Sequence, residues 1–175
     1  VLGIEINEIN NILEENHNNY KCYIANDNSN GQIVISGLNL DLEKLIETLK
    51  SKKIKNIKLP VSAPFHCKLM QKATSIMKDK INNTNFKKSK NIIISNVTGQ
   101  ETQEVDKIKD LLIKQIESPV RWRESVIYMI KNGVSNFIEI GPGKVLSGLV
   151  KRIDKTTNVN TINKIEDLKN IKLND

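Results

Sequence analysis

The sequence predicts a mixed α/β (α+β) protein, because two kinds of residue pattern alternate along the chain. Short runs rich in Val and Ile are typical of strands, and segments in which apolar residues recur every three or four positions are typical of amphipathic helices. The composition fits such a protein, since 38% of the residues are hydrophobic and 27% are charged. The length of 175 residues suffices for one domain with a core or for two small lobes.

The first sixty residues contain two helical segments between strand-like runs. Isoleucines and leucines at helical spacing predict helices at 7–16, with Asn7 as the N-cap, and at 40–52. Residues 26–31 are dense in Asn, Asp and Ser and predict a turn. The resulting order, βαββαβ, is typical of a ferredoxin-like sandwich. The four strand-like runs are 1–5, 21–25, 32–36 and 54–59.

Pro60 and Pro64 mark a change of organisation. Further on, a strand at 137–140, the turn Gly141-Pro142-Gly143 and a helix from about Lys144 indicate the edge of an α/β layer. We expect this turn to serve backbone geometry, because it lacks the length and the Lys-Ser/Thr ending of a P-loop. The remaining expected elements are helices at 66–84, 104–117 and 121–132, strands at 91–95 and 159–162, and a short last helix.

The two histidines have different surroundings. His17 lies in the polar helix end Glu-Asn-His-Asn-Asn and is expected at the surface. His66 follows the apolar, proline-stiffened segment 60–65 at the start of a predicted helix, so its ring is sterically restrained. Such restraint suits a general base, whose imidazole must present one nitrogen reproducibly. A histidine that caps a helix or fills the core fits these local features equally well.

Five sequence blocks, spread over nearly the whole chain, share a likeness to one enzyme family. They are Gly-Gln-Ile-Val-Ile-Ser-Gly (31–37), Val-Ser-Ala-Pro-Phe-His-Cys-Lys-Leu-Met (61–70), Ile-Ser-Asn-Val-Thr (94–98), Ser-Pro-Val-Arg-Trp (118–122) and Glu-Ile-Gly-Pro-Gly-Lys-Val-Leu-Ser-Gly-Leu (139–149). With these blocks in this order and spacing, the chain resembles the C-terminal portion of the malonyl-CoA:acyl-carrier-protein transacylases.

The resemblance implies both a fold and an activity. Residues 1–59 would form a ferredoxin-like small subdomain, in agreement with the βαββαβ order, and residues 60–175 the C-terminal part of an α/β-hydrolase-like acyltransferase core. The implied activity is transfer of a malonyl group from malonyl-CoA to the phosphopantetheine thiol of acyl carrier protein in fatty acid biosynthesis. In the family this reaction passes through an acyl-serine.

The resemblance assigns catalytic roles to His66 and Gln115. His66 is implied to be the general base that deprotonates the serine and later the phosphopantetheine thiol. The family orients the imidazole with a main-chain carbonyl in place of a carboxylate, and here that carbonyl would belong to Gln115. A neutral acceptor fixes the tautomer of the ring without adding a charge.

Three further residues are substrate-binding candidates by the same resemblance. Phe65 corresponds to a phenylalanine that accompanies malonyl selection in related acyltransferase domains, because its bulk crowds a branched extender unit. Asn26 and Asn28 fall where the family lines the cleft between its subdomains, so they are candidates for contacts with the substrate or the carrier arm. Core packing of Phe65 and a simple turn role for the asparagines remain alternatives.

The family's nucleophile has no counterpart in this sequence. In the family the serine lies in a Gly-His-Ser-x-Gly elbow, whereas no Gly-x-Ser-x-Gly occurs in the 175 residues. The arginine that binds the substrate carboxylate also lies upstream in the family, and Arg121, Arg123 and Arg152 do not match its motif. Because the chain also begins without Met, we expect a truncated chain that is inactive on its own.

Composition limits the other classes of partner. The net charge is +7, but aromatic residues make up only 4% of the chain, so we expect an acidic carrier protein and no nucleic acid. No apolar run approaches the roughly 20 residues that span a bilayer. Cys22 and Cys67 lie far apart, which argues against a disulfide or a metal site and favours a reducing compartment. We therefore expect a cytoplasmic protein (organellar in a eukaryote) that needs no cofactor and is a monomer when complete.

Two other functions stay open at this point. The chain could be part of the acyltransferase domain of a polyketide or multifunctional synthase. It could also be a non-catalytic module whose ferredoxin-like lobe recognises a carrier protein or RNA, in which case it would bind tightly without turnover.

Overall fold

The computed structural model describes residues 1–170 of the chain. The chain divides into two compact units, Val1–Ser125 and Val126–Asp175, and each is described by itself. The last five residues of the predicted range 60–175 lie outside the described residues. Among residues 1–170, no helix is both long and apolar enough to cross a membrane.

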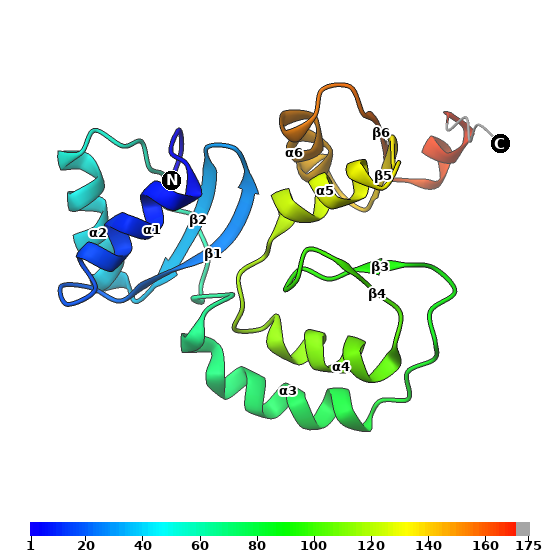
Figure 1. Cartoon of the computed structure of the whole chain (residues 1–175), viewed down its shortest axis with the longest axis horizontal. Coiled ribbons are helices and arrows are strands. Elements are labelled where there is room, and N and C mark those ends of the chain that lie inside the picture. The colour runs from blue at the N-terminus through cyan, green and yellow to red at the C-terminus, as the bar shows by residue number, and fades with distance from the viewer. Residues whose placement is uncertain (171–175) are drawn as a thin grey trace. The chain divides into compact units, whose positions relative to one another are not determined.

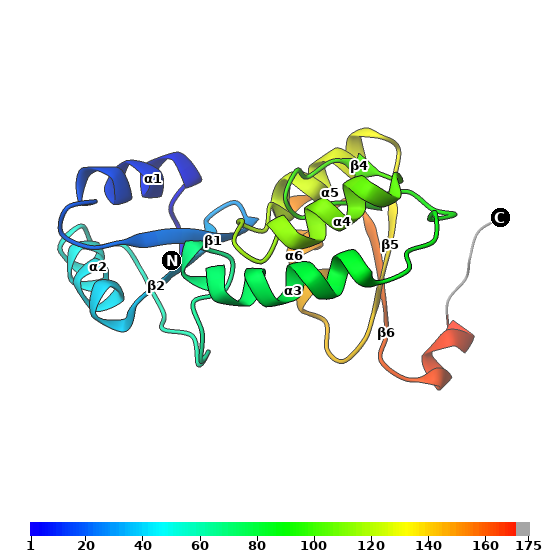
Figure 2. The same ribbon diagram turned by 90° about the horizontal axis from the view of Figure 1, so that it is seen from below.

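The first unit begins with a helix-and-hairpin arrangement. Strands β1 (Cys22–Ser29) and β2 (Gln32–Gly37) form an antiparallel hairpin, and helices α1 (Ile6–Glu15) and α2 (Asn39–Ser51) lie beside it in two perpendicular views (Figures 1 and 2). Leu2 forms single antiparallel bridges with both Gln32 and Lys55. The segment around Leu2 therefore lies between β2 and the segment around Lys55. This is the order of strands in the split βαββαβ sandwich.

One apolar cluster holds these elements together. Helix α1 contributes Ile9 and Ile12, and helix α2 contributes Leu45 and Leu49, each pair at the spacing that places two side chains on one helical face. Ile33 from β2 completes the contact between the helices and the hairpin. Full burial of one such aliphatic side chain is worth about 1.5–3 kcal/mol relative to an exposed one.

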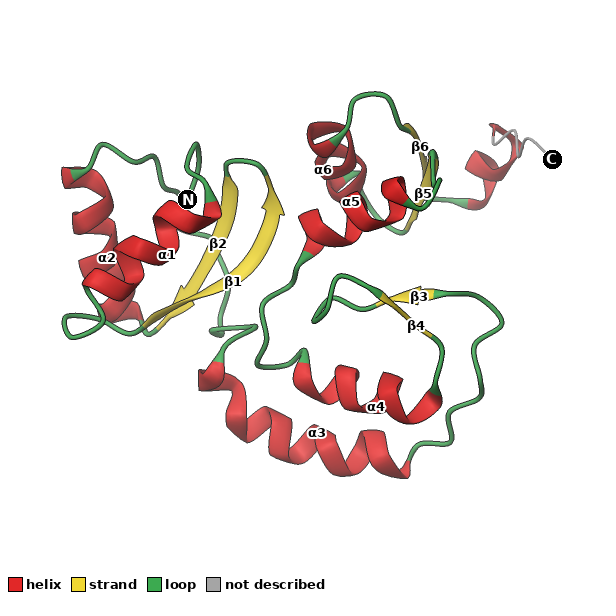
Figure 3. Cartoon of the chain, viewed as in Figure 1, coloured by secondary structure: helices red, strands yellow, loops and turns green. Residues whose placement is uncertain are grey.

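The rest of the first unit is built on two helices. Helices α3 (Gln71–Asn83) and α4 (Val105–Lys114) pack side by side, as Figure 3 shows, and a 3₁₀ turn, η1 (Lys68–Met70), leads into α3. The antiparallel strands β3 (Ile93–Ile94) and β4 (Glu101–Thr102) connect them. Helix α5 (Trp122–Lys131) starts in this unit and continues into the second.

The second unit contains a strand–helix–strand motif. Strands β5 (Asn136–Ile140) and β6 (Asn158–Ile162) pair in parallel, and helix α6 (Val145–Ile153) connects them; the 3₁₀ helix η2 (Ile165–Asn170) follows. The carboxylate of Glu139 accepts hydrogen bonds from the main-chain N–H groups of Leu146 (3.1 Å) and Ser147 (2.7 Å). N–H groups in the first turn of a helix have no main-chain acceptor within the helix. Here the Glu139 carboxylate is the acceptor for two of them.

The predicted mixed α/β class is confirmed, whereas several local predictions are wrong. The expected turn at 26–31 is mostly strand, and only Asn30 and Gly31 make the turn, with a positive φ of 71° at Gly31. Helix α1 begins one residue earlier than expected, so Asn7 lies inside it and Glu5 is the N-cap, in a capping box with Glu8.

Several segment lengths also differ from the prediction: the strand expected at 91–95 is only Ile93–Ile94, and the helix expected at 104–117 is Val105–Lys114. The strands expected at 1–5 and 54–59 are reduced to the bridges at Leu2 and Lys55, and Gly3, with a φ of 75°, ends the extended conformation of the first. The helix expected from residue 66 begins at Gln71, because His66 has a left-handed backbone. The division of the chain between residues 59 and 60 stays a prediction.

Candidate active site

A groove of about 850 Å³ in the first unit brings four of the predicted site residues together. Asn26 and Asn28 line it from β1, and Phe65 and His66 line it from the loop that precedes η1. Phe65 is 47% exposed in this chain. The remaining lining is largely apolar and includes side chains of β2 and α2 such as Ile35.

The imidazole of His66 is held by Gln115. The His66 Nδ1 atom lies 3.0 Å from the main-chain oxygen of Gln115, the residue that ends α4. A carbonyl oxygen can only accept, so Nδ1 carries the hydrogen and, in the neutral ring, Nε2 keeps its lone pair. The geometry therefore leaves Nε2 as the basic nitrogen of the ring.

The main chain of His66 is also restrained. Its φ of 61° lies in the left-handed region, which residues other than glycine rarely adopt and which costs about 1–3 kcal/mol. The hydroxyl of Ser36 donates a 2.7 Å hydrogen bond to the Phe65 carbonyl, directly before this residue. On the other side, Cys67 is buried and its thiol lies 3.2 Å from the Pro64 carbonyl. The surroundings thus hold a conformation that the residue itself disfavours.

The segment after Gln115 lies along the outer edge of β1. The Val120 N–H donates to the Ala25 carbonyl (2.8 Å), and the Asp27 N–H donates to the Val120 carbonyl (2.9 Å), which makes a parallel bridge opposite Asn26. The same short stretch therefore carries the carbonyl that holds His66 and pairs with the strand that bears Asn26 and Asn28.

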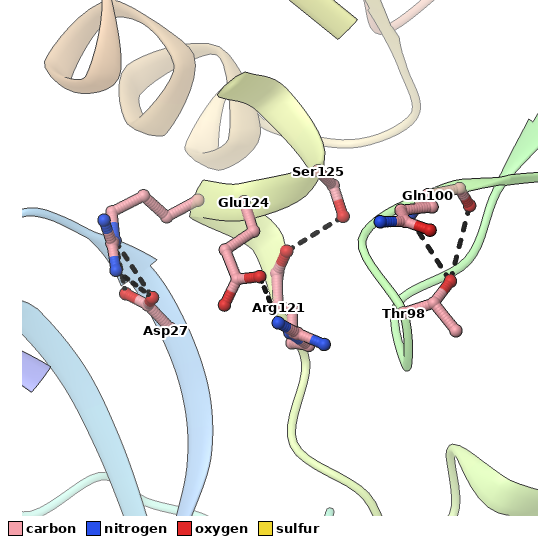
Figure 4. A network of polar contacts seen from close by, with 7 residues as sticks. Asp27, Thr98, Gln100, Arg121, Glu124 and Ser125 are labelled. Atoms are coloured by element: carbon pink, nitrogen blue, oxygen red, sulfur yellow. Dashed lines mark hydrogen bonds and ion pairs between the residues drawn. The ribbon is translucent and has the colours of Figure 1, made fainter. Parts of the chain in front are cut away.

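An ion pair secures the far end of this contact. The Asp27 carboxylate is 3% exposed and accepts hydrogen bonds from Nε of Arg123 (3.0 and 2.9 Å), with Nη2 at 2.8 Å. The hydrogen bond that Arg123 donates to Asp27 is the main cause that raises the pKa of Arg123. Figure 4 shows Asp27 on its strand facing the start of α5, close to the more exposed pair of Arg121 and Glu124.

Sequence reasoning missed three of these residues. Ser36, Asp27 and Arg123 make hydrogen bonds that join segments lying far apart in the chain. The sequence held only a weak signal for Asp27. It lies at the alternating strand positions 25, 27 and 29, which are all buried in the structure. A buried aspartate needs a cation, but nothing in the sequence pattern names Arg123 as that cation.

The described residues offer no evident place for a metal ion. Between residues 1 and 170, no three His, Cys, Asp or Glu side chains are grouped so that they could hold one. The chemistry that the site itself supports is proton transfer at the Nε2 of a histidine beside a partly apolar groove.

Known proteins that are similar to this chain in sequence and structure are named as transacylases. A malonyl CoA-acyl carrier protein transacylase of Staphylococcus aureus is 37% identical over 177 residues, which cover 100% of this chain and 58% of that protein. The crystal structure of a malonyl CoA-acyl carrier protein transacylase from Clostridium perfringens matches with a TM-score of 0.91 and 41% identity, over 97% of this chain and 54% of that one.

A third match contains a carrier protein. It is the structure of a type II polyketide acyl-carrier protein in complex with its malonyl-transacylase, with a TM-score of 0.90 and 31% identity, over 97% of this chain and 55% of that one. No protein-family model matches the chain. The chain spans little more than half the length of the relatives that it matches. These matches confirm the resemblance inferred from the sequence: over its whole length the chain is homologous to the C-terminal portion of malonyl CoA-acyl carrier protein transacylases.

Proposed function

We propose that the complete protein transfers the malonyl group of malonyl-CoA to the phosphopantetheine thiol of acyl carrier protein, in fatty acid biosynthesis. The observation that carries this proposal is the 3.0 Å contact between His66 Nδ1 and the Gln115 carbonyl, in a block that resembles the family's histidine motif. The relatives are named as malonyl transacylases, and one is in complex with a carrier protein, which supports the same substrates here.

In the proposed mechanism, His66 takes up one proton and gives it back in each half of the reaction. Its Nε2 takes the hydroxyl proton of a serine from the N-terminal segment that the relatives possess, while the serine oxygen attacks the malonyl thioester. The thiolate of CoA leaves and takes the proton from the imidazolium. In the second half, Nε2 takes the proton of the phosphopantetheine thiol while the sulfur attacks the acyl-serine. The serine oxygen then leaves and takes the proton back from the imidazolium. By this mechanism the 175-residue chain alone would be inactive.

We assign substrate contacts to three residues that line the groove. Phe65 would limit the space beside the central carbon of the malonyl group. Branched extender units carry a substituent on this carbon and would be crowded by the ring. Asn26 and Asn28 would donate or accept hydrogen bonds with the acyl group or the carrier arm. Both asparagines line the groove that His66 also lines, and they belong to the strand that the Val120 bridge ties to the Gln115 segment.

We further propose the setting of the reaction. The net charge of +7 suits an acidic carrier protein through electrostatic steering. The complete protein would act as a cytoplasmic monomer without nucleic acid, membrane or cofactor, and its small subdomain would be residues 1–59, with the acyltransferase core continuing from residue 60.

A direct test uses the two histidines as a matched pair. The N-terminal portion of the Clostridium perfringens relative is joined ahead of Val1, and malonyl transfer to carrier protein is measured. His66→Asn, which tolerates a positive φ, should lower the rate by about 10²–10⁴-fold. His17→Asn should leave it unchanged, because His17 lies at an exposed helix end. Full activity of the folded His66→Asn protein would overturn the assignment.

A polyketide carrier protein is the second candidate acceptor. The transacylase in the 31% identical complex is bound to a type II polyketide carrier, so the relatives are not restricted to one kind of synthesis. Transfer rates to a fatty acid carrier and to a polyketide carrier, measured side by side, decide between the two. Tight carrier binding without any transfer would favour a non-catalytic module.

A further inference from the structure

Residues 115–123 form a segment with attachments at both ends, which we call the strap. At its first residue the Gln115 carbonyl accepts the hydrogen bond of His66. In its middle, Val120 exchanges two main-chain hydrogen bonds with β1. At its last residue the guanidinium of Arg123 binds Asp27 of β1. The strap therefore ties the acceptor of the catalytic imidazole to the strand that bears Asn26 and Asn28.

The attachment at Arg123 is the stronger of the two contacts with β1. The Arg123 fork meets both carboxylate oxygens, and the side chains of Arg123 and Asp27 are 20% and 4% exposed. Bidentate, charge-assisted hydrogen bonds in such a sheltered place fix direction as well as distance. The neighbouring Arg121 differs, because its pair with Glu124 lies within one helical turn and both side chains are about 40% exposed.

The ion pair between Asp27 and Arg123 also explains why a charged residue is buried in β1. Ala25, Asp27 and Ser29 are all buried along β1, and an unpaired carboxylate at the middle position would be strongly unfavourable. The Asp27 N–H binds Val120 while its carboxylate binds Arg123, so this one residue fixes two points of the strap. If the pair is lost, the Val120 bridge remains as the main-chain contact of the strap with β1.

We propose that Asp27 and Arg123 are positioning residues, which hold the strap so that the Gln115 carbonyl keeps His66 in the Nδ1–H tautomer with Nε2 free as the base. This inference rests on the proposed function, in which His66 is the general base. Neither residue touches the reacting atoms; both act through Gln115.

The test measures the imidazole itself in the 175-residue chain. Ring nitrogens are labelled with ¹⁵N and followed by NMR at a pH of about 8.5, where imidazoles are neutral. The shifts of Nδ1 and Nε2 report the tautomer, and a His17→Asn background leaves only the signals of His66. Arg123→Met removes the guanidinium, Arg123→Lys keeps the charge without the fork, and Arg121→Met is the matched control two positions earlier.

The expected result is a fall of about fivefold in the ratio of Nδ1–H to Nε2–H tautomer for Arg123→Met, and a smaller fall for Arg123→Lys. Arg121→Met should leave the ratio unchanged. An unchanged ratio in a folded Arg123→Met chain overturns the proposal. An equal fall in Arg121→Met also overturns it, because the effect would then be a general loosening of the segment.

A double variant separates positioning from stability. Asp27→Leu with Arg123→Met removes both charges, so no buried carboxylate is left unpaired and the chain should fold even if Arg123→Met alone does not. The proposal expects the tautomer ratio to fall in this variant too, and a preserved ratio overturns it. Because the readout needs no turnover, its failure is distinct from that of the proposed function, which the activity of His66→Asn decides.

Discussion

At the scale of single residues, His66 is restrained twice, through its ring and through its main chain. The ring donates to Gln115, and the left-handed main chain is held by the Ser36 hydroxyl on one side and the buried Cys67 on the other. The resemblance of the sequence blocks to the family was enough to predict the contact between the His66 ring and the Gln115 carbonyl. The positive φ and the bond from Ser36 could not be predicted, because both depend on a strand that lies about thirty residues away in sequence.

Ser36 allows a stability prediction at this scale. Ser36→Ala removes the 2.7 Å hydrogen bond to the Phe65 carbonyl and should lower the free energy of unfolding by about 1 kcal/mol, measured by urea denaturation. Ser51→Ala is the control, since the Ser51 hydroxyl is exposed and bonds only within its own helix end; we expect a change below about 0.5 kcal/mol. Equal effects of the two changes would contradict the role given to Ser36.

Phe65 allows a prediction on selectivity. In the completed protein, Phe65→Ala should reduce the preference for malonyl-CoA over methylmalonyl-CoA by about tenfold, because a smaller side chain leaves room for one extra methyl group. The measurement is the ratio of kcat/KM for the two thioesters. Phe86→Ala is a suitable control, since Phe86 contacts Lys109 and does not line the groove. An unchanged ratio for Phe65→Ala would show that this ring does not select the acyl group.

At the scale of elements, helices with regular apolar spacing were predicted well and strand ends were not. The bounds of α2 and α5 differ from the prediction by a residue, because leucines and isoleucines at a period of 3.6 specify the helix locally. The turn expected at 26–31 is strand because its outer edge pairs with Val120, and Asp27 is neutralised by Arg123. Such partners far along the chain leave no trace in a local pattern.

Helix α6 allows a prediction on pH. Hydrogen bonding from Ser147 and from the neighbouring main-chain N–H groups at the start of α6 lowers the pKa of Glu139 below its ordinary value of 4.5. A carboxylate with a lowered pKa stabilises the folded state above pH 4.5, and this contribution is lost as the pH falls through the lowered pKa. Amide hydrogen exchange in α6 should therefore speed up in acid below about pH 4.5, more than the intrinsic exchange rate predicts.

The matched variants for this prediction are Glu139→Gln and Glu166→Gln. Glu139→Gln should speed up exchange in α6 at neutral pH and remove the acid response, because an amide has no carboxylate to protonate. Glu166 is an exposed residue of η2. The Glu166→Gln chain should therefore show the same acid-dependent exchange in α6 as the unmodified chain. A Glu139→Gln chain that keeps the full acid response would show that another group is responsible.

At the scale of the whole molecule, the described site is one part of the proposed catalytic machinery. The groove, the oriented histidine and its carbonyl all lie in the first unit, whereas the serine that the mechanism needs has no counterpart in the sequence. The chain covers 58% of the Staphylococcus aureus relative, so we propose the activity for the complete protein and not for these 175 residues alone. The resemblance of the five sequence blocks predicts this division of roles, which stays a prediction, whereas the groove and the strap became visible only in the three-dimensional structure.

The central claim is that His66 acts as the base in both halves of a malonyl transfer, and single-turnover kinetics tests it most directly. In the completed protein, acylation by malonyl-CoA and transfer from the acyl-enzyme to carrier protein are followed separately by rapid quenching. We predict that His66→Asn slows both steps by about 10²-fold or more, whereas Asn26→Ala mainly weakens substrate binding. If either step of the folded His66→Asn protein keeps its rate, His66 is not the base for that step and the account is wrong.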